Sequence, residues 1–251
     1  MGIQTKKMSE WLAANGQAIT NASKATMKNA IRADIGQLYD GVFIMFHKKK
    51  DNFPYASRIS EFASYQNKGE VAEGVLLVEG GRQLVIATTE GMGKKWSSKP
   101  VSSSDTSGSV QISGVTTTTD RLISLSDFAG RANTTAIING STSSNITNTE
   151  DYAAGFCNKY SRTNVNGQGL TAGKWWLPSL GEIMMICGNF DKINYALSKI
   201  SGATQLQKDM YWTSTQGTDI DAWDIDFNSS KLDYNSKFHP FRVRPVSAFL
   251  K

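Results

Sequence analysis

The sequence has few of the residues on which several common protein classes depend. Its 251 residues include two cysteines, two histidines and five prolines. No stretch approaches the roughly 20 consecutive apolar residues that cross a bilayer. Two cysteines are too few for a disulfide framework. Cys157 and Cys187 both lie in apolar stretches with helical spacing, which favours buried free thiols, although a pairing between them stays open. We therefore expect neither membrane insertion nor a disulfide-stapled fold.

The scarcity of histidine also limits catalytic chemistry. A Ser-His-Asp triad could recruit only His47 or His239, and neither lies near a nucleophile-elbow pattern. His239 precedes a proline, which favours a surface loop. We expect no enzyme activity, no catalytic residues and no cofactor.

The charge is mildly basic and scattered. Lys and Arg number 27 against 22 Asp and Glu, which gives a net charge of +5. The only tight basic cluster, residues 48–50, is typical of a solvated loop, so we expect no nucleic-acid partner. The first residues lack the apolar core of a secretory signal, and Lys6 stands where the myristoylation pattern needs Ser or Thr.

Residues 1–68 differ from the rest of the chain in their hydrophobic pattern. Met27, Ile31, Ile35 and Leu38 recur at helical spacing, and the apolar run 42–46 has the length of a strand. The segment is too small to bury a core of its own. We therefore predict a helical attachment and oligomerisation segment that docks on another chain or on copies of itself.

Residues 69–251 combine strand and helix patterns, which predicts an α+β domain. Residues 75–78 and 84–87 flank Gly80-Gly81 as in a hairpin. Helices are expected around 152–157, from Leu177 to Gly188 and over 190–200. Ser179 and Glu182 form a capping box at the start of the second. Residues 97–120 and 141–149 are rich in Ser and Thr and are expected to be loops.

The last part of the chain alternates apolar and charged residues, as strands do. Trp223, Ile225 and Phe227 are predicted to face the core, which places Asp224 and Asp226 in water. Likewise, Arg242 and Arg244 are expected to pair with neighbouring carboxylates on the sheet surface. Together with Asp219 and Asp221 the two aspartates could assist a Ca²⁺ site, but a solvated acidic face is our prediction, and we expect no metal.

From about residue 69 to residue 249 the landmarks follow the order of a known family. They are Gly80-Gly81 with 85–87, Trp96-Ser97, 127–134, Ala153-Ala154 with Cys157, 175–179 with Glu182, 211–215, Ala222-Trp223 with Phe227, and 243–246. In these the chain resembles the Lcl C-terminal domain family, also described as Fibrobacter major paralogous domains. The resemblance implies a C-type-lectin-like fold, with two helices on small twisted antiparallel sheets and the terminal strands side by side. It also implies adhesin-like binding.

Two other activities of that fold are not matched by the residues present. Formylglycine-generating enzymes of this fold use reactive cysteines or copper, and the cysteines here do not lie in a shared C-terminal motif. Calcium-dependent lectin sites carry Glu-Pro-Asn or Gln-Pro-Asp, and neither tripeptide occurs.

The window from about 216 to 239 is similar to the variable region of proteins diversified by retroelements. Asn and Tyr codons and their one-step products, such as Asp, Ser and His, crowd this window. Ordinary polar turns have the same composition, so that alternative stays open. Aromatic side chains there suit ligand contact because they offer large area at low entropic cost. The predicted ligand-binding residues are Asp219, Asp221, Asn228, Ser230, Asp233, Tyr234, Asn235, Phe238 and His239.

A helical anchor joined to a lectin-like head resembles bacteriophage fibres and receptor-binding proteins, which need no export signal. We therefore expect a non-enzymatic virion protein whose head, residues 69–251, binds a host-surface protein, a glycan or a virion ligand. Residues 1–68 would contact other virion proteins, with a homotrimer favoured because it raises avidity. The alternatives are a purely structural virion component, such as a capsid decoration or fibre-attachment protein, and a bacterial surface adhesin.

Overall fold

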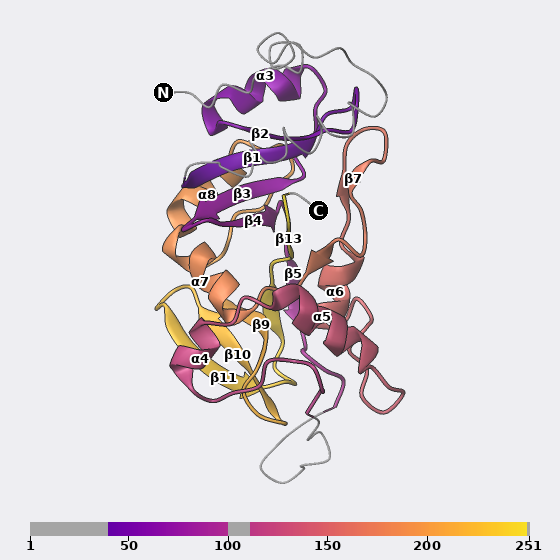
Figure 1. The fold of residues 1–251 in the computed structure, drawn as a ribbon, viewed down its shortest axis with the longest axis vertical. Helices are drawn as coiled ribbons and strands as arrows, with labels where there is room; N and C mark the ends of the chain where they lie inside the picture. The colour runs from indigo at the N-terminus through magenta and orange to yellow at the C-terminus, as the bar shows by residue number, and fades with distance from the viewer. Residues whose placement is uncertain (1–39, 100–110, 250–251) are drawn as a thin grey trace, which may run out of the picture.

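The computed structural model describes residues 40–99 and 111–249, in which two large β-sheets dominate (Figure 1). The six-stranded sheet has the order β2-β1-β3-β4-β13-β8, and the five-stranded sheet the order β11-β10-β9-β12-β5. The strands of the first are β1 (Gly41–His47), β2 (Pro54–Ser57), β3 (Gly74–Glu79), β4 (Arg82–Ala87), β8 (Trp175–Trp176) and β13 (Val246–Ser247). Those of the second are β5 (Gly91–Lys94), β9 (Met210–Gln216), β10 (Asp221–Asp226), β11 (Lys231–Ser236) and β12 (Phe241–Val243).

The remaining elements are short. β6 (Arg162–Thr163) and β7 (Gly169–Leu170) form a two-stranded sheet. The helices are η1 (Ile59–Glu61), α3 (Phe62–Asn67), α4 (Arg121–Leu125), α5 (Gly130–Asn139), α6 (Ala153–Lys159), α7 (Leu180–Gly188) and α8 (Phe190–Leu197). None of the helices in the described part of the chain combines the length and apolar content of a membrane span.

The hairpin predicted around Gly80-Gly81 is confirmed. β3 and β4 pair antiparallel, with Val75 opposite Ile86, and both glycines have positive φ values, of 55° and 77°. Glycine adopts this left-handed conformation without the steric cost of a Cβ. Alternate residues of these strands fill two cores. Val75, Leu77 and Ile86 pack with α7 and α8, while Leu76 and Val85 pack on the opposite face.

The predicted helices after residue 150 are also confirmed as α6, α7 and α8, and 141–149 is a loop. At the start of α7, Ser179 and Glu182 make the predicted capping box. Gly130, the first residue of α5, lies against this cap, and a Cβ there would collide with the Glu182 carboxylate. The cap therefore fixes how α5 and α7 approach each other.

Residues 40–68, which we assigned to the attachment segment, form β1, β2, η1 and α3. β1 pairs with β3 over five residue pairs, so the sheet continues across residue 68 without a break. The predicted strand at 42–46 is confirmed as part of β1. The predicted helical stripe from Met27 to Leu38 lies outside the described residues.

The expected C-type-lectin-like arrangement is wrong. Instead of two helices on small sheets, the described residues form thirteen strands in three sheets. Local motifs predicted most elements correctly, but sheet partners come from pairings distant in sequence. β13 joins β4 to β8, β12 runs parallel to β9, and β1 and β2 extend the first sheet. The alternation of apolar and polar residues along a segment indicates a β-strand, but it does not indicate which other strand pairs with it.

A cluster of charged residues around Glu90 connects β9, β12 and Arg244 to the end of β4 in the six-stranded sheet. Glu90 accepts hydrogen bonds from Arg242 Nη1 (2.7 Å), Arg244 Nη2 (2.8 Å) and the Tyr211 hydroxyl (2.6 Å). Asp209 also accepts from Arg242 Nε (2.7 Å). The predicted pairing of both arginines with carboxylates is confirmed. The predicted surface position is wrong for Arg244, which is fully buried.

Candidate functional site

The predicted ligand-binding residues lie on or beside the β10–β11 hairpin. Its strands pair from Asp221↔Ser236 to Asp226↔Lys231, and β11 is the edge strand of the five-stranded sheet (Figure 1). Asp226 closes the turn, because its carboxylate accepts from the Asn228 N–H (2.8 Å) and the Ser229 hydroxyl (2.7 Å). Ser230 adopts a left-handed conformation, with φ of 57°. This turn is thus locally determined by side-chain hydrogen bonds.

Aromatic residues anchor the hairpin from beneath. Trp223, Ile225 and Phe227 are buried as predicted. Trp223 Nε1 donates to the Thr118 carbonyl (2.7 Å). Trp212 Nε1 donates to the carbonyls of both Lys94 (3.0 Å) and His239 (3.1 Å). The two indoles therefore attach β9, β10 and the 237–240 turn to neighbouring segments.

The predicted contact residues differ in their exposure. Asp219, Asn228, Ser230, Tyr234 and His239 are exposed, and Asp221, Asp233, Asn235 and Phe238 are half-buried. The structure brings all nine residues together in one hairpin and its flanking turns. Their side chains differ in how many contacts they make with the rest of the fold.

Several of these side chains have partners within the fold. Tyr234 lies edge-on against the buried Trp223 of the neighbouring strand β10, with ring centres 5.1 Å apart. Asp233 pairs with Lys231 (2.7 Å). The Phe238 ring lies under Lys95 Nζ (3.4 Å). The His239 ring stacks on Phe241, with ring centres 5.5 Å apart.

Asp224 corrects the prediction of a solvated acidic face. It is fully buried, and burial raises the pKa of its carboxyl from 3.8 to about 7. One oxygen accepts from Asn235 Nδ2 (2.8 Å), and the other has no hydrogen-bond partner in the described residues. Asp224 is buried because its side of β10 faces a second core, in which its register partner Trp212 and its same-face neighbour Ala222 pack. The Asn235 side chain is therefore engaged in holding the buried Asp224 carboxyl rather than displayed to a ligand.

Lys237 is a second buried charge that sequence reasoning missed. Its Nζ donates to Gln216 Oε1 (2.9 Å) and to the carbonyls of Thr218 (3.2 Å) and Asp219 (2.8 Å). Burial lowers the pKa of this amine to about 7. The contacts hold the β9–β10 turn beside the hairpin. Nothing in the sequence distinguishes this lysine from a surface one.

The titratable groups do not assemble into a metal or thiol centre in the described chain. No group of three or more His, Cys, Asp or Glu side chains converges within residues 40–99 and 111–249. Cys157 and Cys187 are both free thiols; Cys157 is buried, which raises its pKa, and Cys187 is half-buried. The chemistry that the hairpin offers is hydrogen bonding and aromatic contact.

No protein-family model matches the chain, and no curated protein matches it. Among solved structures, the chain is similar to a fimbrial protein from Bacteroides ovatus, with 16% sequence identity and a TM-score of 0.42. The match covers 82% of this chain and 42% of the fimbrial protein. The chain thus spans less than half the length of that protein.

Proposed function

We propose that this protein is a non-catalytic, adhesin-like binding module that contacts a surface protein or glycan through its hairpin surface. The hairpin surface comprises Asp219, Asp221, Asn228, Ser230, Asp233, Tyr234, Phe238 and His239. One observation carries the proposal. The side chains of Asn228, Tyr234 and His239 are exposed and make no hydrogen bonds within the described residues, although their backbone is firmly held.

Rigidity below the hairpin surface supports binding energetically. A side chain held in place before binding loses less entropy when a ligand arrives. Trp223, Asp224 and Lys237 supply that support from buried positions, and the half-buried Asn235 donates to Asp224. Asn235, which we first counted as a contact residue, belongs to this supporting set.

The setting that we propose is the tip of a phage fibre, where the N-terminal segment would attach the head to the virion as a homotrimer. A bacterial surface adhesin would use the same hairpin surface. A purely structural role is the second candidate, and the edge position of β11 favours it, because an open strand edge can pair with a neighbouring subunit.

Removing the three unbonded side chains tests the binding role. In the variant Asn228→Ala/Tyr234→Ala/His239→Ala, adsorption of the labelled full chain to a panel of bacterial isolates should fall at least about tenfold. Truncating one of the few residues that dominate an interface costs ~2 kcal/mol or more of binding energy. Adsorption measured by flow cytometry, beside urea unfolding curves, separates lost binding from lost folding.

The matched control is Lys159→Ala/Lys192→Ala, which truncates exposed residues of α6 and α8. It should adsorb like the unmodified chain. Unchanged adsorption of the triple variant would contradict the binding role. Failed particle assembly with that variant, when the isolated chain still folds, would support the structural role instead.

A further inference from the structure

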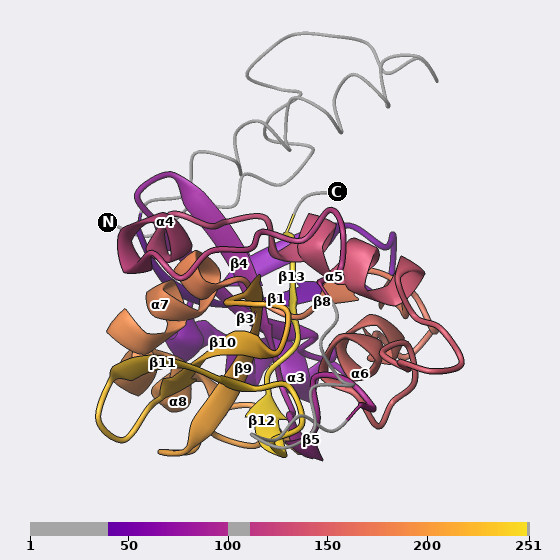
Figure 2. The ribbon, with the colours of Figure 1, turned by 90° about the horizontal axis from the view of Figure 1, so that it is seen from below.

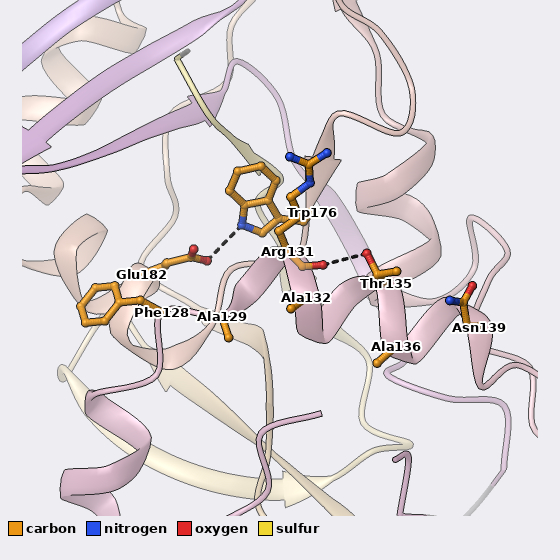
Figure 3. A pocket seen from close by; sticks show the side chains of 9 residues that line it. All are labelled: Phe128, Ala129, Arg131, Ala132, Thr135, Ala136, Asn139, Trp176 and Glu182. Carbon is orange, nitrogen blue, oxygen red and sulfur yellow. Dashed lines mark hydrogen bonds between the residues drawn. The ribbon is translucent and has the colours of Figure 1, made fainter. Parts of the chain in front are cut away.

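A shallow groove of about 660 Å³ runs along α5 and shares no lining residue with the hairpin surface (Figure 3). This volume falls within the range of small-molecule sites. The polar and aromatic residues that line it are Phe128, Arg131, Thr135, Asn139, Trp176 and Glu182. Ala129, Ala132 and Ala136 complete the lining.

Glu182 gives the groove a buried acceptor. Its side chain lines the groove, yet the residue is only 7% exposed. One carboxylate oxygen, Oε2, accepts from Trp176 Nε1 (3.1 Å) and from the Ser179 N–H (2.9 Å). The other oxygen, Oε1, has no hydrogen-bond partner in the described residues. The capping role uses Oε2 alone, so Oε1 is available to a ligand that donates a hydrogen bond.

Further donors lie on the exposed face of α5. Arg131, Thr135 and Asn139 follow at intervals of four residues, so they lie along one side of the helix. The Thr135 hydroxyl donates to the Arg131 carbonyl (2.9 Å), so the donors left for a ligand are Arg131 and Asn139. Arg131 and Trp176 both line the groove, and no described carboxylate pairs with the Arg131 guanidinium. Phe128 lies at the Glu182 end, with Arg82 stacked 3.6 Å from its ring centre.

The charges around the groove restrict its ligand. Arg131 and Arg82 disfavour a cation, and the buried carboxyl of Glu182 disfavours an anion. A neutral ligand that donates to Glu182 and accepts from both Arg131 and Asn139 satisfies all three side chains. It should also carry C–H groups that can lie on Trp176, Phe128 and the alanines. A hexopyranose ring has hydroxyls that both donate and accept, and an apolar C–H face.

We propose that this groove binds a neutral hexopyranose unit of a glycan, as a second site independent of the hairpin surface. The proposal predicts saturation-transfer NMR signals from methyl α-glucoside, methyl α-galactoside or methyl α-mannoside. A single sugar unit in a shallow groove should bind with a Kd on the order of 1 mM, so sugars at about 10 mM suffice.

Two variants locate the signal. Glu182→Gln keeps an oxygen for the Trp176 and Ser179 donors but replaces the free acceptor with an amide N–H, so binding should weaken at least tenfold. Ala132→Trp, at an exposed position, fills the groove without touching the cap and should abolish transfer. If Glu182→Gln fails to fold, Ala132→Trp alone tests whether the sugar binds in the groove. The hairpin triple variant should bind the sugar normally.

Two results would overturn the proposal. One is the absence of transfer from all three glycosides to the unmodified chain. The other is transfer that persists in Ala132→Trp, which would place the sugar elsewhere. Because the hairpin triple variant is measured alongside, failure of this site is distinguishable from failure of the proposed adhesive role.

Discussion

Replacing Arg244 by methionine is expected to lower the free energy of unfolding by roughly 3–5 kcal/mol, since it removes one partner of a buried ion pair together with two further buried hydrogen bonds. Arg244 is fully buried, and its guanidinium donates to Glu90 (2.8 Å) and to the carbonyls of Ala87 (3.1 Å) and Thr204 (3.1 Å). Methionine keeps most of the apolar stem but none of these donors. Urea unfolding at neutral pH measures the loss.

Arg242 provides the comparison within the same cluster. It bonds Glu90 and Asp209, but its side chain is 20% exposed, and Asp209 is 52% exposed. Water can replace much of what Arg242→Met removes, so the expected loss is about 1 kcal/mol. Equal losses for the two arginines would contradict this account of the cluster.

Asp224 is expected to make stability fall as pH rises. Its folded pKa of about 7 lies above the ordinary value of 3.8, so between these values the folded protein binds more protons than the unfolded chain. The stability is fully present below about pH 4 and is lost as pH rises through about 7. At roughly 1.4 kcal/mol per pH unit, this single group accounts for up to ~4 kcal/mol.

Asp224→Asn isolates that contribution. The new amide oxygen can still accept from Asn235, and the side chain no longer ionises. The charged groups around it, Asp226, Lys231 and Asp233, are unchanged, and Glu182, whose pKa is also raised to about 7, affects both proteins equally. Relative to the unmodified chain, the variant should therefore gain stability from about pH 4 to about pH 7, and the difference should level off above that. A difference that stays constant over this range would show that Asp224 is not the titrating group.

The sequence predicted local structure well because local structure depends on nearby residues. The capping box at Ser179 and Glu182, the hairpin at Gly80-Gly81 and the strand alternation at Trp223 each follow from a few adjacent side chains. The alternation also showed correctly which side of β10 faces the apolar core. It could not show that the opposite side is covered too, because that depends on residues distant in the chain, such as Trp96 and Ile137, which pack there with Trp212 and Ala222.

The errors at the site have the same origin. Asp224 was expected in water and Arg244 on the surface, and both are buried by segments distant in the chain. Lys237 and Asn235 sit in a polar window where composition alone cannot separate a supporting residue from a displayed one. The arrangement of three sheets likewise rests on long-range pairings, which local motifs shared with another family do not determine.

The central claim is that the hairpin surface, rather than another face, meets the ligand. Figures 1 and 2 place α6 beyond β5 and β12, at the sheet edge opposite β11. A photocrosslinking residue at Asn228 should therefore capture a surface component of adsorbed cells, whereas the same residue at Lys159 in α6 should not. Both positions are exposed, and neither side chain makes a hydrogen bond in the described residues. Capture from position 159 without capture from position 228 would contradict the account.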